Sequence, residues 1–117
     1  MTRDATRPVD PLVLDLSRTP PIHALDLVQG ERAPQTFLLD RPELLLGSGA
    51  DAELRVESAQ VAARHARFTR KDGEYCCEDL EGEGELFLNG LRVHAAVLRD
   101  GDVLQMANLV FIYRERG

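Results

Sequence analysis

The sequence predicts an all-β fold, either a sandwich or a barrel, for most of its 117 residues. Short apolar or alternating segments recur at intervals of roughly ten residues, a spacing typical of strands in all-β domains. Gly-containing turn signals separate these segments, and most of the chain shows no apolar stripe at helical spacing. A composition of 44% hydrophobic and 29% charged residues is that of one ordinary globular domain.

Three expected strands lie in the first half of the chain. They are an apolar–polar alternation and two short apolar runs, which cover residues 24–27, 36–39 and 44–46. Four more expected strands cover residues 66–69, 75–78, 85–88 and 109–113. Asp72-Gly73 and Asn89-Gly90 are dipeptides typical of two-residue hairpin turns, where both positions need a positive φ, and residues 100–102 form a third expected turn.

Residues 58–68 fit the strand pattern less well. The segment is rich in Ala and Arg, which favour a helix. Its apolar positions form no clean stripe at helical spacing, however. The residues alone therefore leave two alternatives open, a helix or a loop followed by a strand.

Residues 1–21 differ from the rest of the chain in composition. They hold four of the six prolines and show no helical periodicity, so we interpret them as a flexible or docking tail that precedes a domain at 22–117. Residues 12–16 are the apolar stretch that would dock on the domain, either on a sheet or as an added edge strand.

Charge and cysteine content exclude several classes of protein. The net charge of −6 and pI of about 5.0 argue against binding to nucleic acid or to anionic lipid. There is neither an apolar signal sequence near Met1 nor an apolar run long enough for membrane insertion. Cys76 and Cys77 are adjacent strand residues that face opposite sides, which favours a reducing compartment, the cytoplasm, with one thiol in the core.

The acidic excess is concentrated in one segment. Residues 71–85 contain seven acidic residues and a single base, Lys71, while the rest of the chain is almost balanced. We therefore expect the unusual electrostatics of this protein to arise from residues 71–85.

Five sequence pieces in order resemble the forkhead-associated (FHA) domain over about residues 22–116. They cover residues 45–48, 61–66, 79–80, 86–90 and 98–104, with Gly47, the pair His65-Ala66 and the pairs Asn89-Gly90 and Gly101-Asp102 at the family's positions. The resemblance implies a two-sheet antiparallel β-sandwich of about 11 short strands. It also implies that residues 58–64 are a loop and that a strand begins at His65.

The matched residues are those with structural roles in the family. The resemblance implies that Gly47 ends a strand where the backbone turns and that His65 braces the binding loops by hydrogen bonds. It further implies that Asn89 and Gly90 form a hairpin and that Gly101 and Asp102 form the last tight turn. No motif supplies an oriented base or an oxyanion pocket, so we predict neither catalytic residues, nor a cofactor, nor a metal site.

The family's phosphothreonine-contacting residues are absent. Its members hold the phosphate dianion with an arginine and with hydroxyl and amide donors on loops at one end of the sandwich. The residues at these positions here are Ser48, Ala62, Ala63, Glu83 and Gly84. We therefore expect no phosphate-binding residue among them.

Glu81, Glu83 and Glu85 would place negative charge where a phosphate approaches. Two unit charges 4 Å apart repel by about 1 kcal/mol in water and about 4 kcal/mol at an effective dielectric of 20. The acidic loop is open to three interpretations: a solvated hairpin, a surface that attracts a basic partner, or, with Asp79, a calcium site that lacks the closing bidentate Glu of an EF-type loop.

The sequence thus predicts a phospho-independent protein–protein interaction or adaptor module. The predominance of Arg over Lys suggests a GC-rich bacterial genome, and we expect partners in a signalling, secretion, motility or cell-envelope assembly, with homodimerisation also open. The candidate partner-binding residues are Ser48, Asp51, Arg64, Glu81, Glu83 and Glu85. The alternative is an atypical phosphothreonine-peptide reader downstream of a Ser/Thr kinase, with a pocket rebuilt from Arg64, Arg55 and Arg67, although the last two are expected to face solvent.

Overall fold

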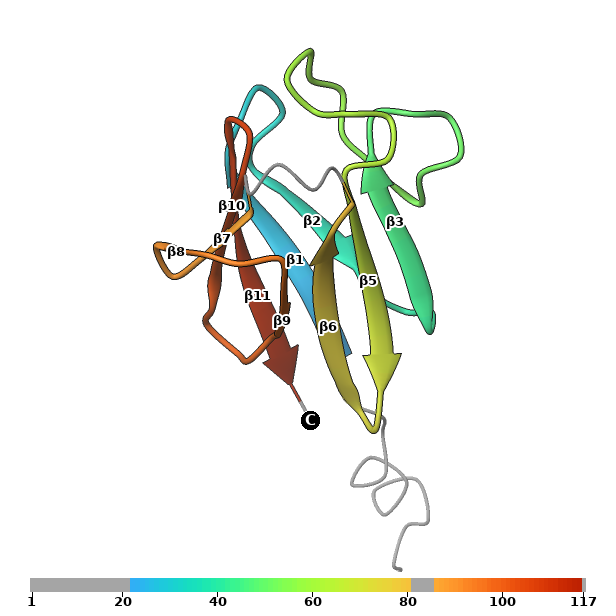
Figure 1. Cartoon of the computed structure of the whole chain (residues 1–117), viewed down its shortest axis with the longest axis vertical. Coiled ribbons are helices and arrows are strands. Elements are labelled where there is room, and N and C mark those ends of the chain that lie inside the picture. Colours follow the sequence, from blue (N-terminus) through green and yellow to red (C-terminus); the bar gives the residue numbers. More distant parts are fainter. Residues whose placement is uncertain (1–21, 81–85, 117) are drawn as a thin grey trace, which may run out of the picture.

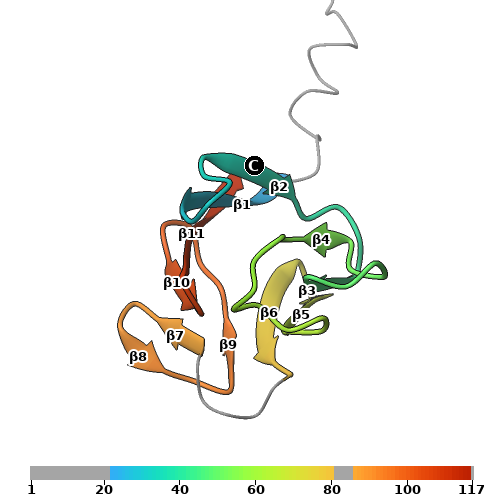
Figure 2. The same ribbon diagram turned by 90° about the horizontal axis from the view of Figure 1, so that it is seen from above.

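Two β-sheets pack face to face in the computed structural model, which describes residues 22–80 and 86–116 (Figures 1 and 2). Sheet A has six strands in the order β2 (Gln35–Leu38), β1 (Ile22–Gln29), β11 (Leu109–Arg116), β10 (Val103–Met106), β7 (Leu86–Leu88) and β8 (Leu91–Arg92). Sheet B has five strands in the order β4 (Leu54–Arg55), β3 (Glu43–Gly47), β5 (Ala66–Lys71), β6 (Glu74–Asp79) and β9 (Ala95–Val97). The predicted all-β sandwich of 11 strands is confirmed.

The sheets are not antiparallel throughout, which corrects the sequence prediction. Strands β3 and β4 are parallel, with Leu46 opposite Leu54 and Gly47 opposite Arg55. The loop between them curls back on the sheet, where Glu53 Oε1 accepts a hydrogen bond of 2.7 Å from the Leu45 N–H. Because of this return, the chain re-enters beside β3 in the same direction.

The ambiguous segment at 58–68 is a loop followed by a strand, as the resemblance implied. Strand β5 begins at Ala66, and the His65 N–H donates to the Leu46 carbonyl at 2.9 Å. Within the loop Val61 is buried, and from β5 Ala66 and Phe68 enter the core. Burial at alternate strand positions therefore outweighs the helix propensity of Ala and Arg.

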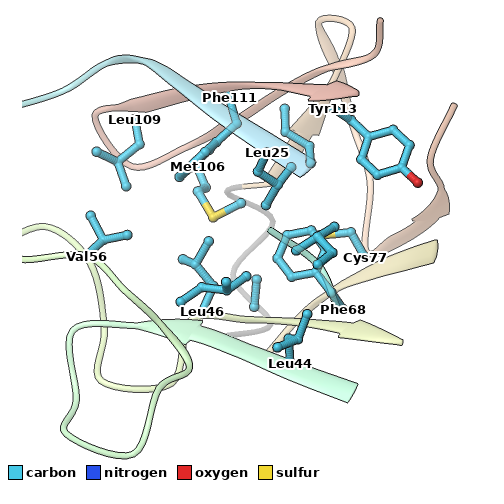
Figure 3. Packing of buried hydrophobic residues seen from close by; sticks show 14 of the residues in the cluster. Leu25, Leu44, Leu46, Val56, Phe68, Cys77, Met106, Leu109, Phe111 and Tyr113 are labelled. Carbon is cyan, nitrogen blue, oxygen red and sulfur yellow. The ribbon is translucent and has the colours of Figure 1, made fainter. Parts of the chain in front are cut away.

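The core lies between the two sheets and contains side chains from both (Figure 3). Leu25, Phe111 and Tyr113 enter it from sheet A, while Phe68 and Cys77 enter from sheet B, and each of these five is fully buried. Cys76, the next residue along β6, is half-buried on the other side of its strand. One of the two thiols is therefore a core group, as the strand alternation predicted.

The hairpin dipeptides lie at turns with the required backbone geometry. Asp72 and Gly73 have φ values of 55° and 80°, and Asn89 and Gly90 have φ values of 50° and 86°. Positive φ at both central positions gives the twist that joins two antiparallel strands through a two-residue loop.

The described residues contain no helix with the length and hydropathy needed to cross a membrane. The tail at 1–21 and the acidic residues Glu81, Glu83 and Glu85 lie outside the described residues, as do Gly84 and Gly117.

Candidate functional site

Two loops of sheet B lie close together at one end of the sandwich (Figure 1). They are residues 48–53, between β3 and β4, and residues 56–65, between β4 and β5. We refer to these two segments, together with Gly47, as the loop end. It contains five residues that the sequence analysis singled out: the partner-binding candidates Ser48, Asp51 and Arg64, and the neighbours Ala62 and Ala63.

Backbone hydrogen bonds join the two loops directly. The Ser48 N–H donates to the Ala62 carbonyl at 3.0 Å, and the Gly49 N–H donates to the Ala63 carbonyl at 3.2 Å. A Cβ atom on Gly47 would collide with the Ala63 carbonyl group. The close approach of the loops therefore requires glycine at position 47, and the backbone frame of the loop end is tightly specified.

His65 connects this frame to the sheets. Its imidazole Nδ1 accepts a hydrogen bond from the Ala62 N–H at 3.1 Å, and its carbonyl accepts one from the Leu80 N–H at 3.0 Å. The residue is 6% exposed, so it serves as a buried brace for the 56–65 loop.

The side chain of Ser48 points to the neighbouring loop. Its hydroxyl donates to the Val61 carbonyl at 2.8 Å and so forms another link between the loops. Ala62 and Ala63 present only methyl groups. At these three positions the loop end offers no cationic side chain.

The arginines near the loop end are paired with carboxylates. Arg64 Nη1 lies 3.5 Å from Asp51 Oδ2, and both side chains are exposed. Arg67 lies 3.3 Å from both Glu43 and Glu78, one carboxylate on each side of its guanidinium. As expected, Arg67 lies on the outward face of its strand, where its side chain is 37% exposed and is held between these two carboxylates.

These ion pairs surround an open hollow of about 330 Å³ beside β3. The residues that line it are Glu43, Leu45, Asp51, Glu53, Arg64 and Arg67. Three carboxylates therefore face two guanidinium groups, which makes the hollow unfavourable for a dianion. The Leu45 N–H that bonds to Glu53 is the main cause of the lowered pKa of this carboxyl group.

Arg55 lies in a different hollow. This depression of about 180 Å³ is lined by Arg32, Gln35, Arg55, Val56 and Glu57, and it lies toward the β1–β2 turn. Arg32 is paired with Glu57 at 2.6 Å. The three arginines of the predicted alternative pocket are thus divided between two hollows.

Asn89 and Asp102 hold two turns together. Asn89 Oδ1 accepts from the Val103 N–H at 2.9 Å, and Asn89 Nδ2 donates to Asp102 Oδ1 at 3.0 Å. Asp102 Oδ2 also accepts from the Arg99 N–H at 2.8 Å, and Gly101 has a φ of 90°. These residues link β7 to the β9–β10 connection and do not line either hollow.

Sequence reasoning did not find the contacts of Glu53 and Asp51. Glu53 lies in no motif, and its bond to the Leu45 N–H depends on the return of the 48–53 loop. Asp51 was a candidate for partner binding without a known contact, and its partner Arg64 is 13 residues away. Within the residues that the structure describes, no three His, Cys, Asp or Glu side chains form a group that could hold a metal ion.

Comparison with known proteins places the fold and this loop arrangement in a family. The family model of the FHA domain matches residues 44–107, a stretch that includes the whole loop end. This chain belongs to the FHA family. It is therefore an FHA-domain protein, and FHA domains are protein-interaction modules.

Bacterial regulators are among its relatives. The chain is 35% identical to the oxoglutarate dehydrogenase inhibitor of Corynebacterium diphtheriae, over 80% of this chain and 68% of that protein. It is 29% identical to the glycogen accumulation regulator GarA of Mycolicibacterium smegmatis, over 73% of this chain and 54% of that protein. The chain thus spans between half and about two thirds of the length of these relatives.

A solved structure agrees with the fold. It comes from a structural and functional analysis of phosphothreonine-dependent FHA domain interactions, and it superposes with a TM-score of 0.71 at 25% identity. The match covers 80% of this chain and 95% of that domain.

Proposed function

We propose that this FHA domain binds a protein partner through its loop end and that binding requires no phosphate on the partner. The observation that carries this proposal is the hydroxyl of Ser48, which stands at the family's arginine position and donates to the Val61 carbonyl. A phosphate dianion needs a forked cation at this point, because only charge-assisted hydrogen bonds compensate for its loss of water.

The electrostatics of the loop end support the same proposal. A phosphothreonine carries a charge of about −1.5 to −2 at pH 7. To bind it, Arg64 would have to leave Asp51, and the carboxylate would then remain close to the phosphate. Arg67 would have to leave two carboxylates, those of Glu43 and Glu78, which would also remain close to the phosphate. Glu83 and Gly84, which complete the family's set of contact positions, lie outside the described residues.

The relatives suggest the class of partner. One is named as an inhibitor of oxoglutarate dehydrogenase and another as a regulator of glycogen accumulation. We infer that this chain acts as a non-enzymatic regulator or adaptor whose partner is an enzyme of central metabolism. Two free cysteines fit a reducing compartment, so the proposal places the protein in the cytoplasm. A basic partner surface and homodimerisation remain the further expectations from sequence.

The proposal is tested by capture of partners from a lysate with and without phosphatase treatment. We expect a retained enzyme to stay bound after phosphatase treatment and to be lost when Ala63→Glu alters the exposed loop end. Thr69→Glu, an exposed substitution on β5, is the matched control and should leave retention unchanged. Retention that phosphatase abolishes would instead support the phosphothreonine reader, and retention by both variants would place the interface away from the loop end.

A further inference from the structure

The outward faces of the two sheets differ in chemistry. Strand alternation and pairing place a mainly apolar set on the outward face of sheet A, namely Ile22, Leu38, Phe87, Val103, Val110 and Ile112. Leu38 is 58% exposed, Ile22 55% and Val103 38%, while the other three are half-buried. On sheet B the outward positions instead carry charged side chains, such as Glu43, Arg67 and Glu78, which form ion pairs.

The apolar face of sheet A also carries a local positive charge. Among the described residues, Arg92, Arg114 and Arg116 lie at its outward strand positions together with one carboxylate, Asp26, which pairs with Arg114 at 3.3 Å. The Arg92 guanidinium lies over the Phe87 ring, 5.7 Å from its centroid. In a chain with a net charge of −6, this face therefore suits a segment that is both apolar and acidic.

Residues 1–21 of the same chain contain such a segment. Residues 9–16 read Val-Asp-Pro-Leu-Val-Leu-Asp-Leu, so Asp10 and Asp15 flank a group of aliphatic side chains. The tail joins the domain at Ile22, the first residue of β1, which is itself on the outward face of sheet A. The occupant with the right chemistry is thus attached at the margin of the face.

The connection is long enough for docking. Five residues lie between Leu16 and Ile22, and the six Cα-to-Cα steps of an extended chain span about 20 Å. Val103 lies opposite Ile112, which lies opposite Asp26, four residues along β1 from Ile22. Four residues along a strand and two strands across correspond to about 13 Å and about 10 Å, a diagonal of about 16 Å. Leu16 can therefore reach Val103 while residues 12–15 extend over the neighbouring strands.

We propose that residues 9–16 dock on the outward face of sheet A, with the leucines against Val103 and Ile112 and the aspartates near the arginines at its rim. This docking involves no phosphate and no residue of the loop end. It gives the apolar face an occupant within the full chain, and any protein that binds this face has to displace the tail. The inference stands independently of the proposed function.

The chain contains no tryptophan, which permits a direct test in the full-length protein. Leu14→Trp introduces a single indole into the tail, and its fluorescence moves to shorter wavelength when it leaves water for an apolar surface. We expect a blue-shifted emission that does not change on dilution and that moves partly toward the water-like position in high salt, which screens the charge attraction.

A second substitution then identifies the surface. Val103→Asp in the Leu14→Trp chain should move the emission to the position of a water-exposed indole. Val97→Asp is the matched control, because Val97 is 47% exposed on the outward face of sheet B, and it should leave the emission blue-shifted. Circular dichroism of each variant verifies that the β-sandwich is intact.

Three results would overturn the proposal. Water-like emission of the Leu14→Trp chain in a folded domain would show that the tail does not dock. Emission that loses its blue shift on dilution would assign the face to a second copy of the chain. A blue shift that survives Val103→Asp but not Val97→Asp would place the tail on sheet B.

Discussion

The loop end combines a backbone frame and a contact surface that differ in how closely they follow the FHA family. The frame has Gly47 under the Ala63 carbonyl and His65 bonded to the Ala62 N–H, as the family's structural positions require. The surface has Ser48, Ala62 and Ala63 at the positions where the sequence resemblance implies the family's phosphate contacts. From this difference we infer that the geometry of the loops depends on their backbone contacts and not on the side chains at these three positions.

The largest effect is expected from Gly47→Ala, which breaks the frame. The added Cβ collides with the Ala63 carbonyl group. Because the atoms it meets, from Ala62 and Ala63, are backbone atoms, they have little room to move away. We expect a loss of about 3 kcal/mol in the free energy of unfolding, measured by urea denaturation. Gly73→Ala is a useful contrast, since a Cβ there meets no atom within 4 Å. Because Gly73 has a φ of 80°, about 1 kcal/mol of backbone strain is the expected cost. Equal losses in the two variants would contradict the tight packing of the frame.

His65→Ala should have the next largest effect. It removes the acceptor of the Ala62 N–H and leaves a cavity beneath the 56–65 loop, so we expect a loss of about 2 kcal/mol. Amide hydrogen exchange should accelerate at Ala62 and change little in β11, which lies in the other sheet. Acceleration that is uniform across both sheets would show that His65 supports the whole sandwich rather than the loop.

A smaller effect is expected at acidic pH from Glu53. The pKa of this carboxyl group is lowered in the folded state, chiefly by the Leu45 N–H. Its contribution is therefore complete above the ordinary glutamate pKa of 4.5 and is lost as the pH falls through the folded-state value. Because the carboxylate is exposed, the contribution should remain below about 1 kcal/mol. Glu53→Gln should flatten this part of the pH profile of unfolding, and an unchanged profile would argue against the contact.

Much of the fold could be predicted because it depends on local pattern. Alternation located β1 and β6, and the Asn89-Gly90 dipeptide located a turn with positive φ. The parallel pairing of β4 could not be predicted, because it follows from the return of the 48–53 loop and not from the two residues of the strand.

The candidate site shows the same division. The expectation that it lacks phosphate contacts rests on residue type at Ser48, Ala62 and Ala63 and stays a prediction. The direction of the Ser48 hydroxyl depends on the position of the Val61 carbonyl in another loop, and the pairing of Arg64 depends on Asp51. Such contacts are set by tertiary packing, which residue type alone does not determine.

A further test of the frame and the contact surface is to place the family's contact side chains on the unchanged loop backbone. Ser48→Arg with Ala62→Ser reintroduces a forked cation and a hydroxyl donor at family positions. We expect this double variant to gain measurable affinity for a phosphothreonine peptide, because the loops that would present the two side chains are already in place. Failure of a folded double variant to gain any affinity would mean that the frame alone does not define the pocket.

The most direct test of phospho-independence is an NMR titration of the unmodified protein with a phosphothreonine peptide library and the same library unphosphorylated. We predict that amide shifts at Ser48, Ala62 and Arg64 do not distinguish the two libraries. Shifts at these residues that saturate in the micromolar range with the phosphorylated library alone would contradict the account.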